Sequence, residues 1–196
     1  YMSASARDSS RYSTPPFQPA STAAGSTRAD LHRLAQEGPP KALSQLIDLR
    51  AGAGEPILQM INEPDPATGT TVLHEACHAG KHGCVSVLLS KGADINAANK
   101  RGWTPLMLAA RFGGASGATT VRVLLFGRAD LLAELPDGKT ALDLAYAAQR
   151  EHEEQEEIME AAGEHRRSSL AKCNAVHLLE EAEEELRARA DEEAEE

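Results

Sequence analysis

The feature that most constrains this chain is a short pattern that occurs three times at a nearly constant spacing. Each copy reads Gly, any residue, Thr, any residue, Leu, and is followed by small or apolar residues. The copies begin at Gly69, Gly102 and Gly138, so they lie 33 and 36 residues apart. Because self-similarity at such a period indicates a repeat architecture, we expect each copy to begin one stacking unit.

The unit around Gly102 predicts how each repeat is built. Thr104 can cap a helix with its hydroxyl, and Pro105 suits the first helical position, where a missing N–H costs nothing. Upstream, Gly92 can end a helix in the left-handed conformation, and Asp94 and Asn96 suit the tight turn beyond it. The second helix also recurs, because Val85–Leu89 and Val121–Leu125 match in register. The sequence therefore predicts a helix, a turn and a further helix in each unit.

This pattern resembles that of the ankyrin repeat family, which reads Gly-x-Thr-Pro-Leu-His-x-Ala-Ala and then, after a helix, Gly-Ala-Asp-x-Asn. The resemblance covers about residues 29–163, as roughly four repeats including capping ones. It implies an all-α solenoid of helix-turn-helix repeats joined by β-turn hairpins. The chain departs from the family pattern at several positions, among them Val72 and Ala141 for Pro, Met107 and Asp143 for His, and Arg128 and Leu132 for Gly and Asn.

We divide the chain into three parts on this basis. Residues 1–28 are rich in Ser, Ala and Pro and read as a disordered tail, residues 29–163 form the repeat domain, and residues 164–196 form an acidic C-terminal helix or tail. The first repeat should begin with a helix capped by Asp30, and residues 51–60 should form an insertion.

The last repeat should contain two helices of unequal polarity. We expect an inner helix over residues 141–148 and a separate, very polar outer helix over residues 151–162. A polar outer face is what a terminal repeat needs in water.

Beyond the last repeat, residues 168–190 predict an additional helix with a narrow stripe at steps of four and three, made of Ala175, Leu179, Ala182, Leu186 and Arg189. Residues 151–196 hold 17 acidic and 5 basic residues, so the acidity of the chain is a C-terminal property. The stripe could dock on the last repeat or on a partner helix, and a solvated acidic helix is the alternative. We expect this acidic helix to provide a second contact, either to a basic partner or as a clamp within a larger assembly.

Composition narrows the possible functions and compartments. No apolar run approaches the roughly 20 residues that a membrane span requires, so we expect a soluble protein without membrane insertion. Three cysteines, two at repeat-core positions, favour a reducing compartment. We expect an intracellular, cytoplasmic protein, with a chloroplast or mitochondrion as the alternative location after removal of a transit peptide. The acidic tail and the lack of a broad basic stripe argue against nucleic-acid binding.

One segment matches a catalytic pattern. His74-Glu75-Ala76-Cys77-His78 fits H-E-x-x-H, the helix of zinc hydrolases, in which two His bind the metal and Glu is the base. The repeat register gives a simpler interpretation, because the resemblance places His74 where the family's His bonds back to the capping Thr, here Thr71. We therefore expect no catalysis, no metal, no cofactor and no small-molecule substrate, with the zinc-dependent hydrolase kept as the alternative.

The remaining signal is an exposed surface for protein partners. The resemblance implies that hairpin tips and the ends of inner helices line a concave binding face. In this register the binding residues are Lys100, Arg101, Trp103, Arg111 and Phe112 of the third repeat, His78 and Lys81 of the second, and Lys139 of the fourth. Trp and Arg are enriched at interface hot spots, which favours a binding role for Trp103 and its neighbouring arginines. The alternative is that Trp103 packs flat on the neighbouring repeat. We expect a protein-protein interaction scaffold that meets an acidic or mixed surface, as a peripheral subunit of a larger assembly.

Overall fold

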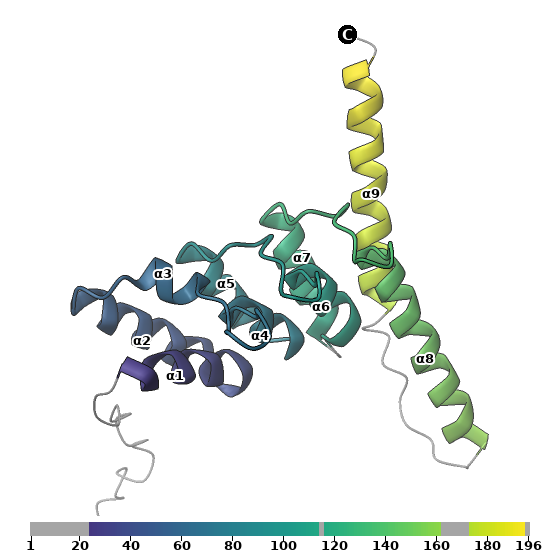
Figure 1. The fold of residues 1–196 in the computed structure, drawn as a ribbon. Coiled ribbons are helices and arrows are strands. Elements are labelled where there is room, and N and C mark those ends of the chain that lie inside the picture. The colour runs from purple at the N-terminus through teal and green to yellow at the C-terminus, as the bar shows by residue number, and fades with distance from the viewer. Residues whose placement is uncertain (1–23, 114–115, 162–172, 195–196) are drawn as a thin grey trace, which may run out of the picture.

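The computed structural model describes residues 24–113, 116–161 and 173–194, and all regular structure in these ranges is helical. Inner helices form one row and outer helices form a second row behind it (Figure 1). The inner row is α1 (Ala24–Glu37), α4 (Val72–His78), α6 (Pro105–Phe112) and α8 (Ala141–Ala161). The outer row is α2 (Pro40–Gly52), α5 (His82–Ser90), α7 (Gly117–Phe126) and α9 (Cys173–Ala194), and a short helix, α3 (Ile57–Asn62), lies between α2 and α4.

Each helix packs on its partner in the same repeat and on the equivalent helix of the next repeat. Thus α4 contacts α5 within its repeat and both α1 and α6 along the inner row, while α5 contacts α2 and α7 along the outer row. Each repeat touches only its neighbours, which is the arrangement of a solenoid. The all-α architecture predicted from the sequence is confirmed.

A continuous apolar core runs between the two rows. Leu73 and Leu106 of the inner row and Leu88 and Leu124 of the outer row are at most 1% exposed. Small residues such as Ala109, also 1% exposed, allow neighbouring inner helices to approach closely. The core contains few aromatic side chains because Leu, Val and Ala fill the narrow space between short helices.

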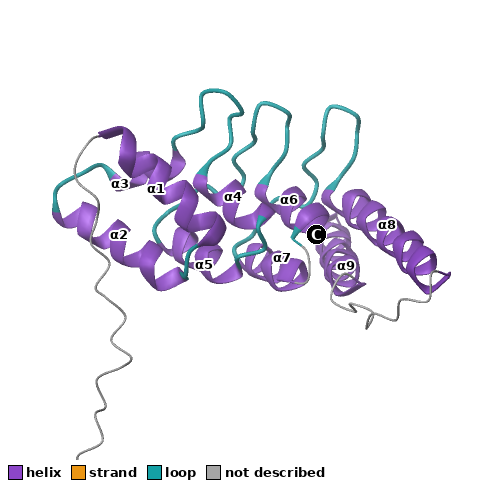
Figure 2. Ribbon diagram, turned by 90° about the horizontal axis from the view of Figure 1, so that it is seen from below, coloured by secondary structure: helices purple, strands orange, loops and turns teal. Residues whose placement is uncertain are grey.

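Long loops connect each outer helix to the next inner helix and project side by side on one side of the helices (Figure 2). Each loop ends in a tight turn that carries the repeated glycine. In the second of these turns, the Gly102 N–H donates to the carbonyl of Asn99 at 2.9 Å, and the Asn99 N–H donates to the carbonyl of Trp103 at 3.0 Å. Gly102 has a φ of 81°, which explains why glycine recurs here.

Asparagine side chains connect successive loops. The Asn62 Oδ1 accepts a hydrogen bond from the backbone N–H of Asp94 at 2.8 Å, and the Asn96 Oδ1 accepts one from that of Asp130 at 2.9 Å. The asparagine of each loop therefore holds the loop that follows it. Leu132, which occupies the same register, has no such group.

Two expected helix bounds were wrong, and the expected insertion is partly helical. The first helix begins at Ala24, so Asp30 lies inside it and forms an ion pair with Arg33 instead of a cap. Part of the expected insertion is helical, as α3. Helix α8 continues without a break from Ala141 to Ala161, because residues 149–161 contain neither Gly nor Pro and many good helix formers.

Helix α9 occupies the outer-row position that pairs with α8. Its first turns pack on α7 and α8, where Ala175 and Leu179 are buried. Ala182 is half-buried, Leu186 is 38% exposed and Arg189 is exposed, so only the first half of the predicted stripe docks on the stack. The division at residues 28 and 163 stays a prediction; residues 1–23 and 162–172 lie outside the described ranges.

Within those ranges, no helix combines the length and the apolar character that crossing a bilayer requires.

Candidate protein-binding site

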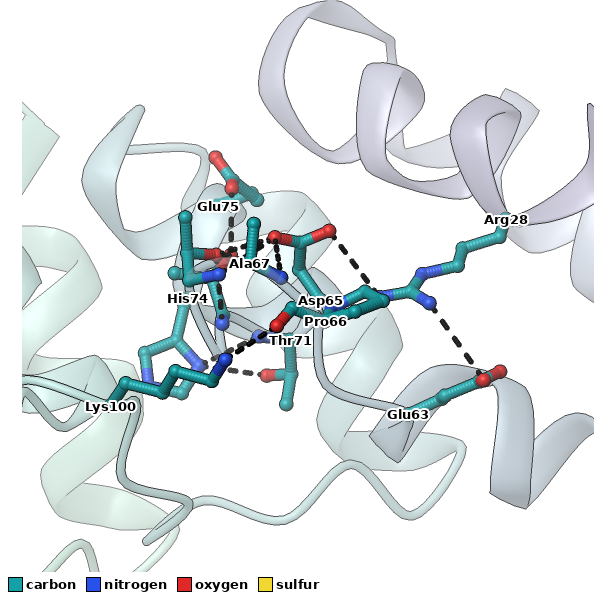
Figure 3. Close-up of polar contacts among 11 residues, drawn as sticks. Arg28, Glu63, Asp65, Pro66, Ala67, Thr71, His74, Glu75 and Lys100 are labelled. Atoms are coloured by element: carbon teal, nitrogen blue, oxygen red, sulfur yellow. Dashed lines mark hydrogen bonds and ion pairs between the residues drawn. The ribbon is translucent and has the colours of Figure 1, made fainter.

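The centre of the candidate site is positioned by a buried histidine. The Nδ1 atom of His74 accepts a hydrogen bond from the Thr71 N–H at 3.1 Å, which completes a capping box at the start of α4 (Figure 3). Because Nδ1 accepts, Nε2 carries the proton and donates to the Trp103 carbonyl at 3.0 Å. His74 therefore connects the cap of the second repeat to the turn that holds Trp103.

Burial is the main reason that the pKa of His74 is lowered, since it penalises the charged imidazolium. The neutral ring is the form that both of its hydrogen bonds require.

Three aromatic rings from two repeats meet at the ends of α4 and α6. The Phe112 ring lies 5.6 Å from the Trp103 ring and 5.0 Å from the His78 ring, measured between centroids, and both pairs are tilted. Phe112 is 44% exposed, Trp103 is half-buried and His78 is exposed. We call these three residues the aromatic cluster. The prediction from the repeat register thus placed residues together that are 34 positions apart in sequence.

Arg111 borders the aromatic cluster and is anchored within the chain. Its guanidinium lies 5.2 Å from the Phe112 centroid and donates to both carboxylate oxygens of Glu151 at 2.6 and 2.7 Å. Both hydrogen bonds come from one guanidinium nitrogen, and they connect α6 to α8; the Arg111 side chain is 22% exposed. Sequence reasoning missed Glu151, because it placed a helix break just before that residue.

The other predicted cations lie outside the aromatic cluster. The Lys100 Nζ donates to the carbonyl of Pro66 on the preceding hairpin (Figure 3), and Lys139 pairs with Asp137 at 2.7 Å. Arg101 and Lys81 are exposed. Part of the positive charge of the predicted surface is therefore already used in holding the hairpins.

A second polar network connects the first helix to the first hairpin. Arg28 lies 3.7 Å from a carboxylate oxygen of Glu63 and 3.7 Å from one of Asp65 (Figure 3). Asp65 also accepts the N–H groups of Ala67 and Thr68, which together with the Thr68 hydroxyl and Arg28 lower the pKa of its carboxyl group. This network orders the hairpin whose carbonyl at Pro66 receives Lys100.

The H-E-x-x-H pattern does not form a zinc site in this fold. Both ring nitrogens of His74 are committed to Thr71 and Trp103, and the ring of His78 packs on Phe112. In the part of the chain that the structure describes, no group of three or more His, Cys, Asp or Glu side chains could hold a metal. The interpretation of His74 as a capping residue is confirmed.

These features define a helical repeat scaffold with a partly exposed aromatic surface, the class of protein that binds other proteins. Comparison with protein families makes the class specific. Residues 31–134 match the family model for ankyrin repeats in three copies, so the chain belongs to the ankyrin repeat family.

Two curated proteins are similar to part of the chain. Both are named protein phosphatase 1 regulatory subunit 27, one from Homo sapiens and one from Mus musculus. Each is 39% identical over 77 residues, which make up 39% of this chain and 48% of the relative. The chain thus spans about half the length of the curated relatives it matches.

Proposed function

We propose that the chain is a non-catalytic adaptor that binds a partner protein through the aromatic cluster on its concave face. The observation that carries the proposal is Phe112, which keeps 44% of its surface exposed although Trp103 and His78 flank it. An exposed phenyl ring held between two further rings is a rigid anchor, since little conformational entropy is left to lose on binding.

The charges around the aromatic cluster indicate the partner's chemistry. Arg101 and Lys81 are exposed, and Lys100 and Lys139 lie on neighbouring hairpin tips. Such a positive rim favours a partner with an acidic or mixed surface and mainly sets orientation and on-rate, while the rings set affinity. Arg111 acts differently, because its ion pair with Glu151 fixes the end of α6 that carries Phe112.

The relatives support a regulatory role. Their name describes a regulatory subunit of protein phosphatase 1. We infer that this chain is likewise a peripheral subunit of a larger assembly. Protein phosphatase 1 is the first defined partner to test.

The test compares two variants that remove a similar exposed apolar area. Phe112→Ser removes the centre of the aromatic cluster, and Leu49→Ser removes a 59% exposed leucine from α2 at the other end of the stack. Immobilised wild type and both variants are exposed to purified protein phosphatase 1 and, separately, to native extract whose bound proteins are identified by mass spectrometry. Circular dichroism confirms that each variant keeps its helical content.

We expect Phe112→Ser to lose the partner and Leu49→Ser to retain it. A loss of about 2 kcal/mol in binding free energy, roughly 30-fold in Kd, is typical of an aromatic hot spot. If Phe112→Ser captures the same proteins as wild type, the aromatic cluster is not the binding face.

A further inference from the structure

The far end of the outer row has a groove with an apolar lining, between the end of α7 with its following turn and the second half of α9. The groove encloses about 570 Å³. Phe126 and Leu132 line its α7 side and are 93% and 67% exposed, and Leu186 lines its α9 side and is 38% exposed. We call it the distal groove. Exposed apolar side chains that gather in one hollow indicate a surface that binds another molecule.

Comparison of the repeats within the chain shows that this lining is specific to the far end. In register, Phe126 corresponds to Ser90 and Leu132 to Asn96. The Ser90 hydroxyl donates to a carbonyl in its own helix, and the Asn96 side chain holds the following loop. Two positions that are polar and locally satisfied in one repeat are thus apolar and exposed in the next.

The second half of α9 extends past the stack (Figure 1), and its two sides differ in charge. One side lines a separate hollow beside Leu142 of α8 and carries the acidic residues Glu180, Glu181, Glu183 and Glu184 together with Arg187. The other side lines the distal groove with Ala182, Glu185, Leu186 and Arg189. Residues three or four positions apart share one side of a helix, which explains the division. The acidity of α9 is therefore turned away from the groove.

The charges in the groove limit what can occupy it. Among the described residues that line it, each wall has one acidic and one basic side chain, because Asp130 and Arg128 lie on the turn after α7 and Glu185 and Arg189 on α9. A strongly basic or strongly acidic occupant would meet a like charge on both walls. The groove instead fits a segment with an apolar stripe and one charge of each sign. The groove side of α9 itself has this composition.

The order of the charges on α9 makes this side complementary to a second copy of itself. Glu185 and Arg189 lie one helical turn apart, with 3.7 Å between their charged groups in the same helix. In two antiparallel copies related by a two-fold axis beside residue 187, each Glu185 lies level with Arg189 of the other copy. Since a helix rises 1.5 Å per residue, the two copies of Leu186 then lie only about 3 Å apart along the helix axis. A parallel pair would place like charges opposite each other.

We propose that the distal groove of each molecule binds the second half of α9 of a second copy, so that the chain forms a two-fold symmetric dimer. Phe126 and Leu132 of each copy contact Leu186 of the other. Glu185 of each copy pairs with Arg189 of the other. A two-fold dimer uses the same patch on both copies, so the patch must match itself in apolar contacts and in charge. The aromatic cluster lies on the inner row, so the dimer is independent of the proposed function.

The first test measures self-association of the full chain by sedimentation velocity at 150 mM salt, between about 1 and 100 μM protein. The groove variant exchanges two apolar residues for those of the preceding repeat, as Phe126→Ser with Leu132→Asn. The control is Leu49→Ser with Leu58→Asn, which removes two leucines that are each 59% exposed at the other end of the stack. Circular dichroism checks that every variant keeps its helical content.

We expect wild type and the control to form a dimer with the same Kd, and the groove variant to dimerise at least about tenfold more weakly. A wild type that remains monomeric over the whole range would overturn the proposal, and so would a dimer that the groove variant forms equally well.

The second test reverses the charges. Glu185→Arg places arginines opposite each other and should weaken the dimer at least about tenfold, although it makes each chain less negative. Glu184→Arg, the control on the other side of α9, changes the net charge equally and should not weaken it. Glu185→Arg combined with Arg189→Glu restores both pairs and should return the Kd to that of wild type. A double variant as weak as Glu185→Arg alone would overturn the antiparallel arrangement.

Phe112 is unchanged in every protein of these experiments. A failure of dimerisation therefore leaves the test of the aromatic cluster unaffected, and loss of partner capture in Phe112→Ser leaves the dimer unaffected.

Discussion

Replacing His74 is the most informative test of how the repeats are connected, because the side chain is fully buried and bonded on both sides. His74→Ala leaves the Thr71 N–H and the Trp103 carbonyl without their partner, at about 1 kcal/mol each. The space left by the ring adds about 2 kcal/mol, as for other large-to-small changes in a core. We expect a loss of about 4 kcal/mol, a large part of the 5–15 kcal/mol typical of a domain.

The assay is urea unfolding followed by circular dichroism at 222 nm. The midpoint should fall with an unchanged slope against urea concentration, because the surface exposed on unfolding is nearly the same. His177→Ala is the control, since His177 lies on the exposed side of α9, and it should change stability by less than about 0.5 kcal/mol. If His74→Ala and His177→Ala lower the unfolding free energy by the same small amount, the hydrogen bonds of His74 do not stabilise the contact between the repeats, and the reasoning is refuted.

The same variant predicts a dependence on pH. The pKa of His74 is lowered in the fold from the 6.5 of the unfolded chain, so below pH 6.5 the unfolded state binds more protons. The stability due to the neutral ring is present above pH 6.5 and is lost as the pH falls through the folded pKa. The difference in unfolding free energy between wild type and His74→Ala should therefore shrink from pH 7.5 to pH 5. A difference that grows on acidification would show that the ring is charged in the folded state.

Two further pairs of variants test the packing by urea unfolding. Gly80→Ala should cost about 3 kcal/mol and Gly54→Ala about 1 kcal/mol. Both glycines have positive φ, 65° at Gly80 and 81° at Gly54. A Cβ at residue 80 would lie 2.3 Å from the Gly113 carbonyl oxygen, whereas a Cβ at residue 54 would have nothing within 4 Å. Equal losses of stability in the two variants would contradict this close approach. Leu179→Ala should cost 2–4 kcal/mol and Leu186→Ala less than about 1 kcal/mol, because only Leu179 is fully buried. Equal small losses would show that α9 is not docked.

The sequence predicts best what local chemistry decides. Gly102 closes its turn with a positive φ, Thr104 caps α6, and Pro105 occupies the first helical position, as their neighbours alone require. Because these local signals recur in one register, they also predict that His78, Trp103 and Phe112 share one face, and their rings do lie close together.

The features that were missed depend on contacts between distant residues. An exception is the continuation of α8: residues 149–161 contain nothing that ends a helix, and the expected break came from the repeat register and not from these residues. The ion pair between Arg111 and Glu151 joins residues 40 positions apart and forms only because α8 continues. Similarly, the exposure of Phe126 follows from the path of α9, which the pattern of α7 does not contain.

The late position of α9 in the chain has a consequence for the order of folding. In the outer row, α5 ends at Ser90 and α7 begins at Gly117, whereas α7 ends at Phe126 and its cover, α9, begins only at Cys173. During synthesis the earlier repeats can close one after another from local contacts, but the outer side of α7 stays uncovered until α9 has left the ribosome. Closing a longer loop is slower, so the far end of the stack should be the last part to assemble and the one most in need of protection meanwhile.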